Sequence, residues 1–259
     1  MPVSYCKNST ISEAWGLICG LPARLDDTDT AVLLRAAKEH IPKLQQKPAI
    51  VSVNVIQELT QPFWREQVAW EDERYIARFG HRYLSVHFLK KAEKRYETFA
   101  TSLKPALDTW LKLYENALTT GDDKHPVDRI AFGYVNTFEF ELDGFDLSRF
   151  FKMSFGVVRG ITRDGLTTID IGCTFFDQER NAYLSVNLSV ESPSRENSKI
   201  RIITKVLAEK RGLEGVSYAN RDQLDMILLE AKSAAKDTFF NCATDETHEI
   251  MGAVNDASS

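Results

Sequence analysis

The fold of this chain is decided by the stretch DRIAFGYVNTFEF, residues 128–140, in which large apolar side chains recur at every second position. Successive side chains of a β-strand point to opposite faces of its sheet, so this period of two predicts a half-buried strand. Asn136 is the polar exception on the apolar face, and an unpaired buried amide costs about 1–3 kcal/mol. We therefore expect Asn136 to have hydrogen-bond partners. The other side chains predicted on that face are Ile130, Phe132, Tyr134, Phe138 and Phe140.

Two roles remain open for Asn136. In the structural role, its amide bridges to the backbone at a helix end or a strand bulge. In the functional role, Asn136 and its neighbour Tyr134 line an otherwise apolar ligand pocket, in which the amide is the polar anchor. The alternation pattern is compatible with both roles.

Length and composition describe an ordinary soluble chain that folds as one large domain or two small ones. It has 259 residues, of which 43% are hydrophobic and 27% charged, and its net charge is -5. An acidic balance argues against a nucleic-acid partner, because phosphate contacts need clustered lysine and arginine. The first 15 residues lack the pattern of a signal peptide, and no window approaches 18 consecutive apolar residues. We expect a cytoplasmic protein without a membrane span.

The cysteines are predicted to be reduced. The chain has four, Cys6, Cys19, Cys173 and Cys242, and they are far apart in sequence. Cys19 and Cys173 lie within apolar strand patterns, which predicts that both are small buried side chains. Scattered cysteines in a cytosolic protein are normally thiols.

The first half of the chain is predicted to contain five strands and two helices. The first helix runs from Asp26 to Ile41 and stops at Pro42. The second keeps one apolar stripe from Ala92 to Ala117 through Pro105, which indicates a kink near 101–105 or two abutting helices. The predicted strands are Ile11–Leu21, Ala49–Leu59, Trp64–Trp70, Tyr75–Phe79 and Arg82–Leu89.

The second half begins after the turn-forming residues 121–126 and again contains five predicted strands. Lys199–Leu207 is rich in β-branched residues and favours a strand, although its Ala-Glu-Lys-Arg tail leaves a helix open. A final helix follows the capping box of Asn220 and Gln223. The other predicted elements are strands at Val127–Leu142, Met153–Thr162, Leu166–Phe176 and Tyr183–Val190, a hairpin turn at Arg163–Gly165, and short helical turns at Asp146–Phe151 and Asp245–Met251.

Both halves therefore have the order strand, helix, four strands, helix. This predicts an α+β protein with two similar halves, residues 1–122 and 123–251, followed by a disordered tail at 252–259. Each half would be a curved antiparallel sheet gripped by helices. The TATA-binding-protein-like fold uses such a duplicated order, but an analogy of fold does not supply a function.

Four stretches carry a resemblance to a known family. They are ISEAWGLICGLP at 11–22, Tyr96 with Phe99, AFGYVNTFEF at 131–140, and AAKDTFFNCATDETHEIM at 234–251. The chain resembles a sporadically distributed family of uncharacterised bacterial proteins of roughly this length. The central motif of that family reads Gly-Leu-Arg-Tyr-Ile-Asn; here Tyr134 and Asn136 match it, whereas Gly133 replaces the arginine. Patchy distribution implies an accessory role, as in phage defence or toxin–antitoxin pairs.

Motifs for chemistry are sparse in the sequence. The five histidines are scattered, and His81 and His87 stand too far apart on one strand to share a metal ion. The sequence contains no phosphate-binding loop, dinucleotide fingerprint or nucleophile elbow. We therefore assign no catalytic residue, no metal and no cofactor from the sequence.

Two surface features indicate a protein partner. Lys90, Lys91, Lys94 and Arg95 form a basic cluster, which is usually a solvated face but could dock an acidic partner or phosphates. Trp64 follows Pro62 in an edge-like position, where an exposed ring would indicate a partner groove. The favoured interpretation is a non-enzymatic binding or regulatory protein that acts through protein–protein contacts. The alternative is an enzyme or small-molecule sensor with a pocket beneath the Tyr134–Asn136 strand.

Overall fold

The computed structural model describes most of the chain. The described residues are 3–6, 10–20, 27–47, 64–80, 82–91, 96–118, 127–141, 147–152, 168–191, 199–213, 215–251 and 253–255. The predicted strands Ala49–Leu59 and Met153–Thr162, together with the hairpin turn Arg163–Gly165, lie outside them.

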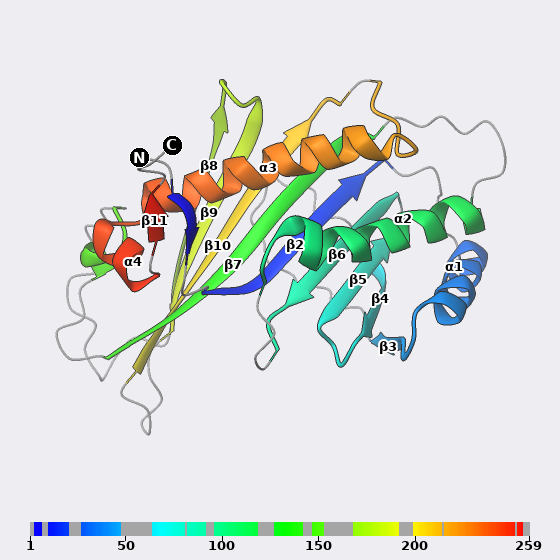
Figure 1. Ribbon diagram of the computed structural model, residues 1–259, viewed down its shortest axis with the longest axis horizontal. Helices are drawn as coiled ribbons and strands as arrows, with labels where there is room; N and C mark the ends of the chain where they lie inside the picture. Colours follow the sequence, from blue (N-terminus) through cyan, green and yellow to red (C-terminus); the bar gives the residue numbers. More distant parts are fainter. Residues whose placement is uncertain are drawn as a thin grey trace. The chain divides into compact units, whose positions relative to one another are not determined.

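The fold is α+β and is built on an open antiparallel sheet of nine strands (Figure 1). The strand order is β3-β4-β5-β6-β2-β7-β10-β9-β8, so consecutive strands are mostly neighbours. The strands are β2 (Ile11–Cys19), β3 (Gln45–Lys47), β4 (Trp64–Trp70), β5 (Tyr75–Gly80), β6 (Tyr83–Leu89), β7 (Arg129–Glu141), β8 (Thr168–Asp177), β9 (Ala182–Glu191) and β10 (Lys199–Arg211).

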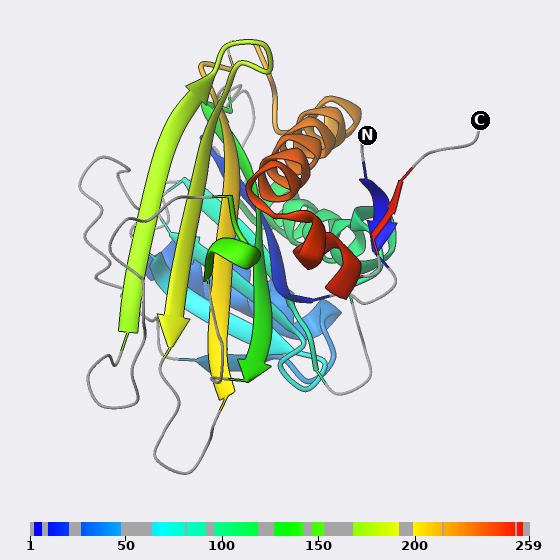
Figure 2. The same cartoon turned by 90° about the vertical axis from the view of Figure 1, so that its left-hand side faces the viewer.

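Each predicted long helix is present, although its bounds differ from the predicted ones, and two short strands form a second sheet. The helical segments are α1 (Asp27–His40), a π-helical turn (Phe99–Leu103), α2 (Lys104–Leu118), a 3-10 turn (Leu147–Arg149), α3 (Arg221–Cys242) and α4 (Asp245–Ile250). The strands β1 (Val3–Cys6) and β11 (Ala253–Asn255) pair antiparallel, near the two chain ends in Figure 2.

The chain divides into two compact units. Unit 1 comprises Met1–Ser12, Gly133–Ala208 and Lys232–Ser259, and unit 2 comprises Glu13–Phe132 and Glu209–Ala231. The elements β2, β7, β10 and α3 each contribute residues to both units.

In unit 2, α2 packs on one face of the sheet, and β2 shows which residues belong to that face. A Cβ atom on Gly16 would lie 3.8 Å from Leu107 and 3.9 Å from Leu103, both of which belong to the helical segment. The face of β2 that bears Gly16 therefore faces α2, and the odd-numbered residues of β2 point to the opposite face. Val86 is the partner of Gly16 on β6 and shares its face, because directly opposed residues in a ladder lie on the same side.

The helix break predicted near Pro105 is confirmed. A π-helical turn at Phe99–Leu103 precedes α2, and Pro105 is the second residue of α2. Proline is tolerated in the first turn of a helix, because the N–H that it lacks would have no partner there. Thr98 caps the turn by accepting a hydrogen bond from the Thr101 N–H at 3.2 Å. Residues 96–98 are not helical, so the continuous helix predicted from Ala92 starts too early.

In unit 1, the inner face of β7 packs on aromatic side chains from the C-terminal part of the chain. Phe138 stacks on Phe239 of α3 with ring centroids 6.3 Å apart, and it meets Phe151 edge to face at 6.1 Å. Phe140 packs on Phe150 at 4.1 Å. The alternation that predicts an aromatic inner face for this strand is thus confirmed.

Three further sequence expectations have clear outcomes. Lys199–Leu207 is a strand and continues to Arg211, so the helical alternative is wrong. Asn220 caps α3 as expected, because its Oδ1 accepts the Gln223 N–H at 3.2 Å, whereas the Gln223 side chain accepts from the Asn220 amide Nδ2 and not from the backbone N–H that a capping box requires. The tail predicted to be disordered from 252 instead contains β11, whose backbone groups pair with β1. The sequence pattern missed this strand because three residues are too few to show a period.

Candidate functional site

Asn136 and Tyr134 lie on β7 and are buried, with exposed fractions of 3% and 6%. The Thr10 hydroxyl donates to Asn136 Oδ1 at 3.1 Å, and the Ser12 hydroxyl donates to the backbone oxygen of Val135 at 3.1 Å. Side chains at the start of β2 therefore tie β7 to that segment. The partner of the Asn136 amide is thus a side-chain hydroxyl, whereas the structural role expected a bridge to the backbone.

The basic cluster is only partly described. Lys90 and Lys91 are exposed just after β6, whereas Lys94, Arg95 and the side chain of Trp64 lie outside the described residues. Lys91 Nζ lies 3.1 Å from Glu73 Oε2, and Lys47 Nζ lies 2.5 Å from Glu73 Oε1. Hydrogen bonds from Lys47 and Lys91 lower the pKa of Glu73. Glu73 of the acidic turn at 71–73 thus offsets the charge of Lys91, one lysine of the basic cluster.

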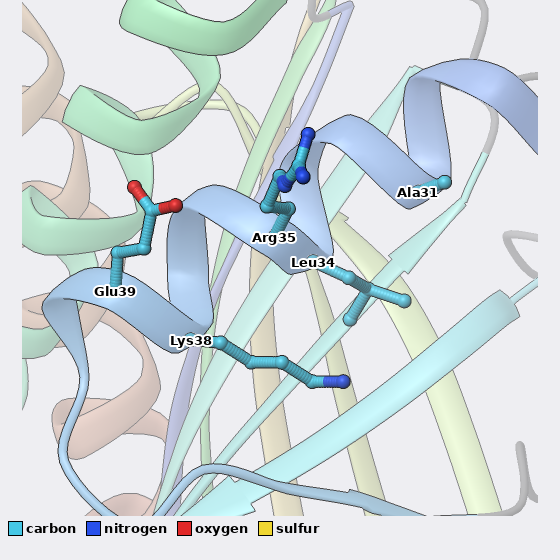
Figure 3. A pocket seen from close by; sticks show the side chains of 5 residues that line it. All are labelled: Ala31, Leu34, Arg35, Lys38 and Glu39. Atoms are coloured by element: carbon cyan, nitrogen blue, oxygen red, sulfur yellow. The ribbon is translucent and has the colours of Figure 1, made fainter.

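A shallow depression runs along α1 (Figure 3). Its lining residues are Ala31, Leu34, Arg35, Lys38 and Glu39, all from this one helix. A hollow formed by the exposed face of a single helix lacks the convergent walls of a ligand pocket. We assign it no role.

The structure brings together a polar row that the sequence analysis missed. It consists of Glu13 on β2 with Ser85 and His87 on β6, all in unit 2. These three side chains lie on the sheet face opposite α2, since they alternate with residues that face the helix. Ser85 and His87 are 1% and 5% exposed, and the side chain of Glu13 is 27% exposed. We call this set the Glu13–His87–Ser85 row.

The hydrogen bonds of the row match a neutral histidine ring that carries its proton on Nδ1 beside an ionised carboxylate. His87 Nδ1 lies 2.6 Å from Glu13 Oε1, and His87 Nε2 lies 2.8 Å from Ser85 Oγ. An ionised carboxylate only accepts hydrogen bonds, so Nδ1 must carry a proton. In the neutral ring, Nε2 is then the acceptor, and the Ser85 hydroxyl donates to it. Trp15, opposite His87 in the ladder, stacks on the imidazole with centroids 6.0 Å apart.

A charged residue lies opposite the serine in the β5–β6 ladder. Arg78 on β5 is the direct ladder partner of Ser85, so it lies on the same face of the sheet. Its Nε donates to Gln67 Oε1 of β4 at 2.9 Å, which orients the guanidinium. Burial lowers the pKa of Arg78, and the charge of Glu13 opposes that effect. The four strands β4, β5, β6 and β2 thus place an amide, a guanidinium, a hydroxyl, an imidazole and a carboxylate on one face.

The row can polarise a hydroxyl. A serine whose proton points to a neutral imidazole, which a carboxylate holds from the other side, has the hydrogen-bond order of a nucleophilic triad. The same order also satisfies three polar groups in a buried place. In the sequence, only the spacing of Ser85 and His87 on one strand could have indicated it, because Glu13 is 74 positions away from His87.

A second polar cluster in unit 2 surrounds Cys19, whose thiol is a poor nucleophile. Arg129 and Glu209 form an ion pair at 3.7 Å next to Cys19. Burial raises the pKa of Cys19 to about 12, against the opposing effect of Arg129. At neutral pH the sulfur therefore stays a thiol, which is a poor nucleophile. Within the described residues there is no group of three or more His, Cys, Asp or Glu side chains that could hold a metal ion.

The strand β8 of unit 1 is exposed from Gly172 to Phe176. Phe175 and Phe176 are 45% and 46% exposed, and Cys173 is also exposed. The prediction that Cys173 is buried is therefore wrong, whereas Cys19 is buried as expected. Cys173 and Phe175 oppose Val186 and Leu184 of β9, so the apolar stripe of β8 continues one that is buried on β9.

No protein-family model matches the chain, and no curated protein matches it significantly. Among the described residues, no helix is long and apolar enough to cross a membrane.

Proposed function

We propose that this is a binding or regulatory protein that acts through protein–protein contacts, with β8 as its contact surface. The observation that carries the proposal is the exposure of Phe175 and Phe176 on one strand, at 45% and 46%. Large aromatic side chains are enriched at protein interfaces, and their burial contributes most of the binding free energy there. The strand is the last in the order of the described sheet.

The partner that fits this surface is a protein segment with apolar side chains and a basic flanking residue. Phe175 shares a face with Cys173, while Phe176 packs on Tyr183 on the other face, with centroids 5.0 Å apart. Two acidic residues, Asp170 and Asp177, stand on the same strand before and after this apolar stretch. Asp177 is paired with Arg180 at 2.9 Å, so Asp170 is the carboxylate that would attract a basic residue of the partner during encounter.

A cytoplasmic location and an accessory role, such as an antitoxin or a phage-defence component, belong to the same proposal and rest on the family resemblance. The alternative of an enzyme or sensor with a pocket beneath the Tyr134–Asn136 strand gains no support from the hydrogen bond between Thr10 and Asn136. That bond gives the amide, which the alternative makes the polar anchor of a ligand, a partner within the protein.

Site-specific photo-crosslinking tests the contact surface. A photoreactive phenylalanine analogue replaces Phe175 or Phe176 in the native host, and Leu229 serves as the matched control, because it is 47% exposed on α3. We expect one crosslinked protein from the β8 positions and none from position 229. The purified partner should then lose at least about tenfold in affinity for Phe175→Ser, which corresponds to one interface anchor worth about 1.4 kcal/mol. Equal crosslinking at all three positions, or unchanged affinity, would remove β8 from the interface.

We also infer that the fold is an internal duplication of the kind found in the TATA-binding-protein-like fold. The support is the strand order on the two sides of the β2–β7 pair. From β2 outward the order is β6, β5, β4, β3, and from β7 outward the described order is β10, β9, β8. In each half, the strand that comes first in the chain is thus the sheet neighbour of the strand that comes last, β2 of β6 and β7 of β10. After that last strand the chain continues into a helix, α2 in the first half and α3 in the second. An experimental structure in which residues 10–120 and 126–243 fail to superpose would end this idea.

A further inference from the structure

We propose that Ser85 is a nucleophile for acyl transfer, with His87 as its general base and Glu13 as the residue that positions the histidine. The proposal goes beyond the protein-binding role, because the row shares no residue with β8. It rests on three observations of the structure: the hydrogen-bond order of the row, the identity of the ring nitrogens involved, and the arginine opposite the serine in the ladder.

The first two observations concern the direction of proton transfer. Ser85 Oγ lies 2.8 Å from His87 Nε2, and Glu13 Oε1 lies 2.6 Å from His87 Nδ1. These distances are within the range for proton transfer from a nucleophile to a base and for a base held by an orienting carboxylate. The carboxylate sets the tautomer in which Nε2 is free of a proton, which is the form that can accept one from the hydroxyl.

The third observation concerns charge. A hydroxyl that attacks a carbonyl carbon creates an oxyanion, and a fixed positive charge nearby stabilises it. Arg78 is the cross-strand partner of Ser85, and its Nε donates to Gln67 Oε1 of β4 at 2.9 Å, so a positive charge lies on the same face of the sheet as the serine. The backbone N–H groups of a strand interior serve the ladder, so the guanidinium takes the place of a backbone oxyanion hole.

The reaction that this arrangement would perform is hydrolysis of an ester or thioester. Ser85 Oγ forms a bond to the acyl carbon while its proton moves to His87 Nε2. The bond from the acyl carbon to the alcohol or thiol breaks, and the leaving group takes that proton from Nε2. Water then attacks the acyl-serine with His87 again as base, which releases the acid and restores the hydroxyl.

Access limits the size of the acyl group. Ser85 is 1% exposed, whereas the Glu13 side chain is 27% exposed, so the row meets solvent at its carboxylate end. A substrate must therefore displace the protein atoms that cover Ser85. Substrates with small acyl groups are favoured for that reason. Trp15 and Leu17 lie on the same face and present an apolar surface to such a group.

Labelling by diisopropyl fluorophosphate tests the nucleophile directly. In that reaction Ser85 Oγ bonds to phosphorus, fluoride leaves, and the proton passes to His87. We expect one diisopropylphosphoryl group on the folded protein, located on Ser85 by peptide mass spectrometry. Ser185 is the internal control, since it is a buried strand serine whose neighbour is the Thr174 hydroxyl at 3.2 Å instead of a histidine. It should stay unlabelled, and Ser185→Ala should label at the wild-type rate.

Two variants distinguish a catalytic triad from a buried hydrogen-bond network whose role is only structural. His87→Gln and Glu13→Gln should each reduce the labelling rate by at least about 10²-fold, the contribution of a general base and its orientation. The rate in the wild type should also depend on pH, because a base that already carries a proton cannot accept one from Ser85, and Glu13→Gln should alter this pH profile. Circular dichroism checks that each variant is folded, and the wild-type pH profile remains decisive if His87→Gln does not fold. An unlabelled wild type, equal rates in a folded variant, or labelling of Ser185 would overturn the proposal and leave the row a buried structural network.

Discussion

At the scale of single residues, Asn136 shows how one polar side chain can hold an apolar face in register. Its amide is 3% exposed and accepts the Thr10 hydroxyl at 3.1 Å. Replacement by alanine leaves that hydroxyl without its acceptor in a part-buried place. We therefore expect Asn136→Ala to lower the free energy of unfolding by about 1–3 kcal/mol. Denaturant unfolding measures this, provided that the slope m is unchanged.

The matched control for Asn136 is Thr10→Val, which removes the same hydrogen bond from its other end while keeping the shape of the side chain. In a double-mutant cycle the two changes should couple by about 0.5–1.5 kcal/mol, because each removes the same interaction. Strict additivity would show that the contact between Thr10 and Asn136 contributes nothing. Unchanged stability in Asn136→Ala would return this residue to the list of ligand anchors.

The cysteines differ in reactivity for reasons that the structure makes explicit. Cys19 is buried and its pKa is raised to about 12, whereas Cys173 is exposed. Only the thiolate reacts with disulfide reagents, so at pH 8 we expect Cys173 to be labelled rapidly and Cys19 only after unfolding. Burial also raises the pKa of Cys242, which should react more slowly than Cys173. Peptide mass spectrometry after timed labelling distinguishes the sites, and rapid labelling of Cys19 in the folded protein would contradict the buried position.

At the scale of elements, α2 is fixed to its sheet by one large ring. Trp110 is fully buried and lies 5.4 Å from Phe79 and 6.0 Å from Trp70, measured between ring centroids. Trp110→Ala should destabilise the protein by about 3–5 kcal/mol, because it leaves a cavity. Its indole Nε1 has no hydrogen-bond partner among the described residues.

Trp110→Phe is the matched control for this cavity. It keeps an aromatic ring for stacking and removes the unpaired N–H, so we expect a loss of only about 1–2 kcal/mol. Thermal and chemical unfolding of both variants decide the comparison. Equal losses for alanine and phenylalanine would mean that the N–H group contributes more than the ring volume.

Long elements with a regular apolar repeat could be predicted from the sequence, and the structure explains where the regular helix is interrupted. The apolar stripe of α2 continues through Pro105, and the structure resolves the stripe into a π-helical turn followed by an α-helix. The polar row could not be predicted in the same way. Its carboxylate comes from β2 and its histidine from β6, and only strand pairing brings them to 2.6 Å. Register is a tertiary property that periodicity does not contain.

At the scale of the whole molecule, the alternation of β7 and the β-branched run of β10 correctly indicated an antiparallel α+β protein. The order of the strands could not be read in advance, since a strand pattern gives its faces but not its neighbours. The pair of β1 and β11 was missed for a related reason. These strands have four and three residues, and they become strands only because each supplies hydrogen-bond partners to the other.

The division into two compact units predicts how the protein unfolds. The elements β2, β7, β10 and α3 run from one unit into the other without a break, so unfolding of one unit alone would cut each of them internally. The last eleven residues of α3, for example, belong to unit 1 and the rest to unit 2. Helix and strand formation are cooperative, so a cut of this kind is costly. We therefore expect a single cooperative transition.

Two spectroscopic probes can test this cooperativity, because all four tryptophans belong to residues 13–132 of unit 2. Tryptophan fluorescence thus reports on unit 2, and a fluorophore attached to the exposed Cys173 reports on unit 1. In urea both signals should change at one midpoint and with one slope, which is the criterion for two-state unfolding. Trp110→Ala should shift both midpoints together, although the substitution lies in unit 2. A shift of the tryptophan signal alone would show that the two units unfold independently in spite of the elements they share.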